Sequence, residues 1–240
     1  MVFKFSKTGH YHTCIGEHNQ DSIYCVENKR FGVIALADGI SSCKKARAGA
    51  ETAARAIAEL FFSKGDVIMS LEKKQISELT IAHIRHELKK QTIGENNNIE
   101  DYSSTVSCVV FDGKTGKLMC FNVGDSAVFA NDNGKVAVIS SPLCGVYGCC
   151  STTTKNTEAV ADIKILDANG FSSVMICSDG AWKEATEKNK IKQELLNAVA
   201  FGEYDKFKEY LEKKNCFDDC SFVVSDFGLQ RRKPCLKEVV

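Results

Sequence analysis

The chain has 240 residues, which indicates one domain or at most two small ones, and a chain of this size folds without disulfides or structural zinc. With 44% hydrophobic residues, 26% charged residues and only 2 Pro, it is a globular sequence and not a collagen-like or low-complexity one. Its 31 Lys and Arg balance its 31 Asp and Glu, so overall charge does not attract nucleic acid or an anionic membrane.

The sequence favours a cytoplasmic location. No run approaches the roughly 20 apolar residues of a membrane span, and the first residues lack the apolar core and cleavage site of a signal peptide. The 12 Cys are spread along the chain, and several stand in apolar runs, where Cys behaves as a small core residue. Because no spacing fits a four-ligand zinc site, we expect free thiols and not disulfides or a metal site.

The first half of the chain is predicted to form two strands and then two helices. In chain order these elements cover residues 22–28, 31–37, 45–62 and 72–90. Gly65 is expected to end the first helix, because Gly is common just past a helix C-terminus. The polar stretch 91–102 is expected to be a loop.

The second half is predicted to consist of short strands with hairpin turns, followed by a helix pair. The strands cover residues 105–111, 117–123, 126–130, 135–139, 161–166, 172–177 and 221–227. The helices cover 187–200 and 203–214, and 141–160 is expected to be irregular. Helices that come in pairs between blocks of antiparallel strands indicate a layered α+β domain and not alternating βαβ units.

Five aspartates stand at the ends of predicted strands. They are Asp21, Asp38, Asp125, Asp179 and Asp218. Strand ends are rigid positions at which side chains can converge on one rim. Converging carboxylates repel one another unless a cation lies among them, and an all-oxygen ligand set points to a hard ion, Mg²⁺ or Mn²⁺. Gly39, directly after Asp38, leaves room for a backbone carbonyl to bind the metal as well.

Each of these aspartates also has an ordinary structural interpretation. Asp-Gly and Asp-Ser are common turn dipeptides, and a single Asp at a strand end is more often a turn or capping residue. From spacing alone, the turn interpretation therefore stays open beside the metal-binding one.

Six short motifs follow one another along the chain. In order they read HNQDSIY, ALADGIS, SSTVSCVVF, FNVGDSAVF, MICSDGAW and FDDCSFVV. No single motif is specific, but their order over residues 8–227 resembles the protein phosphatase 2C family of metal-dependent serine/threonine phosphatases. The Gly-x-x-His sequence at 9–12, ahead of the Gln-Asp pair, is similar to the short bacterial branch of that family.

The resemblance implies an α+β fold built as a four-layer α-β-β-α sandwich, in which helix pairs flank two antiparallel sheets. This agrees with the order of the predicted elements. We expect a single catalytic domain over residues 1–228 and a tail over 229–240.

The resemblance also assigns the aspartates to a centre of two Mn²⁺ or Mg²⁺ ions. Asp38 would bridge the two metals, and the carbonyl of Gly39 would bind the second. Asp179 and Asp218 would hold the first metal, while Asp21 would act largely through metal-bound waters.

Two further assignments follow from the same resemblance. In the Asp-Asp-Cys-Ser sequence, Asp218 and not Asp219 matches the ligand position. Asp125 resembles the aspartate of a third, weaker metal site of bacterial members, a site that shares Asp179.

The implied reaction is hydrolysis of phosphoserine or phosphothreonine in a protein by a metal-activated water, with Asp21, Asp38, Asp179 and Asp218 acting through the metals. We expect a monomer in bacterial-type signalling that opposes a serine/threonine kinase. Nucleic acid and membrane are not expected as partners.

Two departures from the family pattern bear on mechanism. Many members carry a phosphate-binding Arg three residues before the Asn of the first motif, where this chain has Gly16. His12 and His18 are the nearest candidates to replace it in binding the substrate phosphate. Residues 40–42 (Ile-Ser-Ser) follow the Asp-Gly pair, so a His general acid is absent there.

Two other functions stay open. The Gly at position 16 favours a catalytically weak pseudophosphatase that serves as a regulatory binding module, although the intact aspartates argue against it. A phosphatase of a small phosphorylated metabolite would use the same centre.

Overall fold

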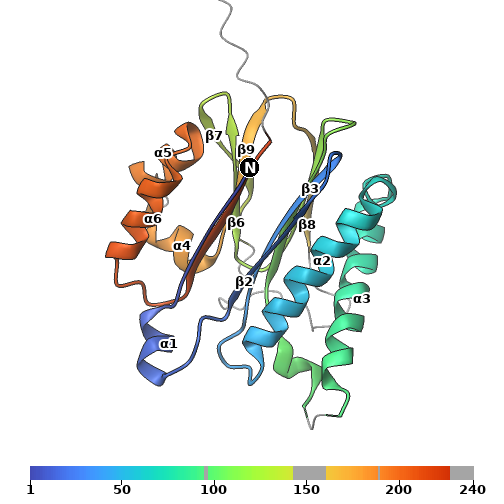
Figure 1. The fold of residues 1–240 in the computed structure, drawn as a ribbon, viewed down its shortest axis with the longest axis vertical. Coiled ribbons are helices and arrows are strands. Elements are labelled where there is room, and N and C mark those ends of the chain that lie inside the picture. Colours follow the sequence, from blue (N-terminus) through green and yellow to red (C-terminus); the bar gives the residue numbers. More distant parts are fainter. Residues whose placement is uncertain (95–96, 143–160, 189, 228–240) are drawn as a thin grey trace, which may run out of the picture.

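The computed structural model describes residues 1–94, 97–142, 161–188 and 190–227. Two five-stranded antiparallel sheets pack face to face, and helices cover the outer face of each sheet (Figure 1). The four-layer α-β-β-α sandwich predicted above is therefore confirmed.

The first sheet has the strand order β2-β3-β4-β5-β8. Its strands are β2 (Asp21–Glu27), β3 (Phe31–Asp38), β4 (Val106–Asp112), β5 (Lys117–Val123) and β8 (Asp162–Asp167). Two long helices, α2 (Ala46–Ile68) and α3 (Lys73–Thr92), cover its outer face, and a 3-10 turn, η1 (Ile99–Tyr102), follows them (Figure 1).

The second sheet has the order β1-β12-β9-β6-β7. Its strands are β1 (Val2–Lys7), β12 (Cys220–Asp226), β9 (Phe171–Cys177), β6 (Ala127–Asp132) and β7 (Lys135–Ser140). Its outer face is covered by α4 (Asp179–Glu184), α5 (Gln193–Phe201) and α6 (Tyr204–Lys213). A short helix, α1 (His10–Ile15), lies between β1 and β2 in the chain.

The central strands are mostly apolar because both of their faces are buried. In β3, Val33, Ala35 and Ala37 pack under the helices, whereas Ile34 and Leu36 pack against the facing sheet. Alternate side chains point to opposite faces of a strand. One apolar run therefore supplies two hydrophobic layers.

The first long helix does not end at Gly65 as predicted. It continues to Ile68 across a kink at Lys64, where φ is −133°. Gly65 is buried, and a Cβ there would lie 3.3 Å from the ring of Phe31. Its small size lets the helix approach the sheet, so this Gly serves packing and not termination.

Several short elements differ from the prediction. β1 and α1 were not expected, and the 91–102 loop contains η1. The helix predicted over 187–200 begins only at Gln193, because a hairpin of β10 (Thr186–Glu187) and β11 (Lys190–Ile191) precedes it. Lys188 has a φ of 48°, which a continuing helix does not allow. Most of the irregular segment predicted at 141–160, and the 229–240 tail, lie outside the described residues.

Eight cysteines fall within the described residues, and all eight are free thiols. Cys108, Cys120 and Cys177 are core residues, as predicted from their apolar surroundings. Burial raises the pKa of Cys120 to about 12, which keeps this thiol protonated at neutral pH. No helix of the described residues is long and apolar enough to cross a membrane.

We predict that Phe61→Ala lowers the free energy of unfolding by about 3–5 kcal/mol. Phe61 is fully buried between α2 and the first sheet, where its ring meets that of Phe121 at 6.0 Å between centroids. Urea unfolding of both proteins measures the change. Phe201→Ala is the control, because Phe201 is 67% exposed and should change stability little.

Candidate metal centre

Asp21 and Asp38 lie side by side at one end of the first sheet. Asp21 begins β2, Asp38 ends β3, and the two are direct partners in the antiparallel register. The backbone of Asp38 is fixed further by Thr105, whose Oγ1 accepts a hydrogen bond from the Asp38 N–H at 3.1 Å. The two carboxylates therefore start from rigid neighbouring positions.

Asp179 and Asp218 come from neighbouring strands of the second sheet. Asp179 follows β9 and begins α4, and Asp218 lies two residues before the start of β12. Gly180 lets the two segments touch, since a Cβ there would lie 2.2 Å from the carbonyl oxygen of Asp219. This close approach brings both carboxylates to the end of the sandwich where Asp21 and Asp38 lie. We call this acidic end, formed by Asp21, Asp38, Asp179 and Asp218, the rim.

The carboxylates from the two sheets act on one another. Burial raises the pKa of Asp38 well above its usual value, and the charges of Asp21 and Asp179 raise it further, with a smaller effect of Asp218. Burial also raises the pKa of Asp21 well above its usual value; the neighbouring Ser221 hydroxyl opposes this, and the charges of Asp219 and Asp179 add to it. Buried carboxylates that repel one another are stabilised in their charged form when a cation lies among them.

The oxygen atoms at this rim fit a divalent cation. Both carboxylate oxygens of Asp21 and Oδ1 of Asp179 are buried and have no hydrogen-bond partner. Buried carboxylate oxygens without a donor are costly, and a hard cation is the ligand that satisfies them.

The side chains do not form a closed ligand set as they stand. Within the described ranges, no three His, Cys, Asp or Glu side chains lie close enough together to enclose a metal ion. Mutual repulsion opposes that closeness when no positive charge compensates it. The carboxylates thus lie at one rim, where they raise the pKa of Asp21 and Asp38. The assignment as metal ligands stays a prediction for Asp21, Asp38, Gly39, Asp179 and Asp218.

Asp125 lies beside α4, in the turn between β5 and β6. It is buried, and its backbone oxygen accepts a hydrogen bond from Nε1 of Trp182 at 2.8 Å. The Nζ of Lys183, one residue further along α4, lies 2.5 Å from Oδ2 of Asp179 and 4.0 Å from Oδ2 of Asp125. Lys183 was not among the predicted site residues, although its spacing of four from Asp179 is that of helical ion pairs.

Lys183 is charged in this position. Burial of its side chain alone would lower the pKa of Lys183, but the hydrogen bond to Asp179 and the neighbouring negative charges outweigh that effect and raise it. Its ammonium is thus part of the rim.

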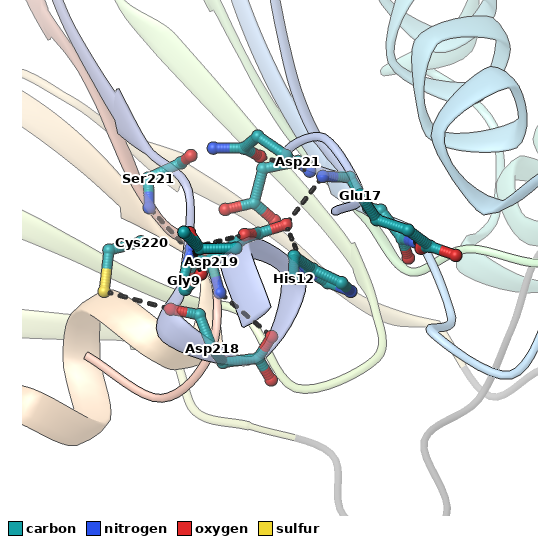
Figure 2. A network of polar contacts seen from close by, with 12 residues as sticks. Gly9, His12, Glu17, Asp21, Asp218, Asp219, Cys220 and Ser221 are labelled. Atoms are coloured by element: carbon teal, nitrogen blue, oxygen red, sulfur yellow. Dashed lines mark hydrogen bonds and ion pairs between the residues drawn. The ribbon is translucent and has the colours of Figure 1, made fainter. Parts of the chain in front are cut away.

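Asp219, the neighbour of Asp218, anchors the segment around α1 (Figure 2). Its carboxylate accepts hydrogen bonds from the backbone N–H of Gly9 at 2.7 Å and of Gln20 at 2.6 Å. Nδ1 of His12 lies 2.9 Å from Oδ2 of Asp219, and both side chains are buried. These contacts give Asp219 a structural role, which supports Asp218 as the ligand.

The two histidines predicted to bind substrate differ in position. Both ring nitrogens of His12 are buried, and Nδ1 lies beside Asp219, so the structure gives this side chain a structural partner, and its substrate-binding role stays a prediction. Its partner Asp219 lies 207 positions away, which the local sequence could not show. His18 is exposed, and its role stays a prediction.

The presence of Gly at position 16 is explained by the local backbone conformation. It caps the C-terminus of α1 with a φ of 73°, and its N–H bonds back to carbonyls of that helix. Any other L residue, Arg included, is strained in this left-handed conformation. The Gly that replaces the Arg of the family pattern at position 16 is therefore explained by the left-handed turn that ends α1.

A similar fold is found in solved bacterial phosphatases. A bacterial serine phosphatase superimposes with a TM-score of 0.67 at 17% identity, over 94% of this chain and 96% of that one. Serine/threonine phosphatase Stp1 from Staphylococcus aureus gives 0.68 at 16%, over 94% of each chain. The catalytic domain of phosphatase PstP, solved with two manganese ions, gives 0.66 at 16%, over 94% and 97%.

The sequence itself matches a family model described as Protein phosphatase 2C over residues 8–213. This chain belongs to the protein phosphatase 2C family. No curated protein matches the chain.

We predict that Asp219→Ala lowers the free energy of unfolding by about 3 kcal/mol, because two buried backbone N–H groups lose their acceptor. Hydrogen exchange should also become faster at the amides of Gly9 and Gln20. Chemical unfolding and exchange of the purified protein test both effects. Asp205→Ala, an exposed position on α6, is the control and should leave these amides unchanged.

We also predict that Asp38→Asn stabilises the metal-free protein at pH 7. A carboxyl whose pKa is raised on folding favours the folded state only while protonated, so its ionisation destabilises that state as the pH rises. The gain in melting temperature should be small near pH 4 and larger at pH 7, in EDTA. With Mn²⁺ the order should reverse, and a variant less stable than wild type in EDTA at pH 7 would contradict the assignment.

Proposed function

We propose that this protein is a metal-dependent phosphatase that removes phosphate from phosphoserine and phosphothreonine in proteins, using two Mn²⁺ or Mg²⁺ ions. The observation that carries the proposal is the rim itself, where Asp21 and Asp38 of one sheet face the charges of Asp179 and Asp218 from the other. Membership of a phosphatase family supports the same conclusion.

The residues of the rim would share the ions as follows. Asp38 lies between the two sheets' carboxylates and would contact both ions, with Asp179 and Asp218 on one side and the Gly39 carbonyl on the other. The unpartnered Oδ1 of Asp179 is the atom available for this purpose, since Oδ2 is bound to Lys183. Asp21 would hold solvent at the buried end of the rim.

The backbone at Gly39 is held firmly enough to act as a ligand. Its N–H donates to the carbonyl of Gln20 at 3.2 Å, and it forms a bridge with Ser104. A Cβ on Gly39 would lie 2.7 Å from backbone atoms of Ala46, so the start of α2 rests directly on this residue. A fixed backbone at the rim is what a carbonyl ligand requires.

When bound, the two ions supply a nucleophilic hydroxide near neutral pH and neutralise the phosphoryl oxygens. The side chains of this protein hold that centre and do not attack phosphorus themselves. Because Ile40, Ser41 and Ser42 follow Gly39, no His stands at that point of the sequence to protonate the leaving oxygen.

The wider setting is also proposed. The substrate would be a phosphoprotein of a bacterial-type signalling system in the cytoplasm, phosphorylated by a serine/threonine kinase, and the enzyme would act as a monomer. Residues 1–228 would form the catalytic domain and 229–240 a tail.

The test is release of phosphate from a phosphothreonine peptide with millimolar Mn²⁺, with Mg²⁺ and with EDTA. We expect activity with metal only. Asp38→Asn and Asp179→Asn should each lower it about a hundredfold or more, because a catalytic metal contributes several kcal/mol to the transition state. Asp205→Asn, an exposed site, is the matched control and should retain full activity.

Three outcomes would contradict the proposal in different ways. Activity that survives EDTA would exclude a metal centre. A folded protein that binds Mn²⁺ without turnover would be a pseudophosphatase. A small phosphorylated metabolite that is hydrolysed in preference to phosphopeptides, and that phosphopeptides do not compete with, would make the protein a metabolite phosphatase.

A further inference from the structure

The position of Lys183 bears on how many metal ions the centre holds. Lys183 lies one helical turn after Asp179 in α4, and its Nζ contacts Oδ2 of Asp179 at 2.5 Å. The same Nζ is 4.0 Å from Oδ2 of Asp125. The ammonium thus lies between the two carboxylates that the family resemblance assigns to a third metal site.

Trp182 holds this arrangement together. Its indole N–H donates to the backbone oxygen of Asp125 at 2.8 Å, which ties the β5–β6 turn to α4. The Nζ of Lys183 is 5.9 Å from the centroid of the Trp182 ring. The hydrogen bond from Trp182 to the Asp125 backbone therefore brings the Asp125 carboxylate near the Lys183 ammonium, although it involves neither charged group.

A cation is already built into this part of the rim. Two facing carboxylates need compensating positive charge, and here a covalently attached ammonium supplies it with a charge-assisted hydrogen bond. A metal ion bound to Oδ2 of Asp179 and to Asp125 would have to displace it. The ammonium leaves Oδ1 of Asp179, which is buried and unpartnered, to the two-metal centre.

We propose that the Lys183 ammonium replaces the third metal ion, so that the site on Asp125 and Asp179 binds no metal and the protein holds two ions. This rests on the proposed function for the first two ions only. If the ammonium replaces the third ion, the side chain at position 183 determines how many metal ions the protein binds.

The test counts Mn²⁺ ions bound to the full chain by equilibrium dialysis and isothermal titration calorimetry. Wild type should bind two ions. Lys183→Asp should bind a third, because three carboxylates then face one another, with at least tenfold higher affinity than any further ion shows for wild type. Lys183→Met, which removes only the charge, should also gain an ion, although a weaker one. Lys114→Asp makes the same charge change at an exposed turn and should stay at two.

The added ion should depend on Asp125. In the double variant Lys183→Asp with Asp125→Asn, the count should return to the wild-type value. Circular dichroism and thermal melting show which variants are folded, and if Lys183→Asp is not, the comparison of Lys183→Met with wild type decides.

The proposal is overturned if folded Lys183→Asp and Lys183→Met bind no more Mn²⁺ than wild type. It is also overturned if wild type binds three ions and loses one in Asp125→Asn. Because the readout is a difference in ion count, it does not depend on turnover. A wild-type protein that binds two ions but hydrolyses nothing would remove the proposed function and leave this inference standing.

Discussion

Repulsion among carboxylates at one rim is the constraint on which this structure depends. The packing of the sheets brings Asp21 and Asp38 from one sheet against Asp179 and Asp218 from the other, and burial makes their charges more costly. Three apolar layers, one between the sheets and one beneath each helix layer, hold the rim together against that cost. The fold thus stabilises an arrangement that favours cations.

Neighbouring acidic residues have opposite roles in this arrangement. Asp219 points inward and is satisfied by the N–H groups of Gly9 and Gln20, so it works as an internal anchor. Asp218 keeps a partly exposed side chain and faces the charge of Asp179. The anchor fixes the loop from which Asp218 projects, and it ties the start of the chain to β12, which also pairs with β1.

Local sequence patterns predicted most of the sheets because their strands are long apolar runs buried on both faces. They could not predict β1, whose pairing of Val2 with Ser225 spans almost the whole chain. The burial of His12 against Asp219 escaped prediction for the same reason. Lys183 was missed because α4, the short helix that aligns it with Asp179, was not expected, although the spacing was visible in the sequence.

Positions 16 and 183 determine where side-chain positive charge is absent and where it is present near the rim. At Gly16 the left-handed backbone at the end of α1 strains any other L residue, which disfavours the Arg that the family resemblance leads one to expect at this position. At Lys183 a cation is held by helix geometry between Asp125 and Asp179. The Lys183 ammonium is covalently attached and is present at any metal concentration, whereas the occupancy of a weak third metal site would change with the metal concentration. Under the two proposals together, the response of the protein to metal would depend on the two central ions alone.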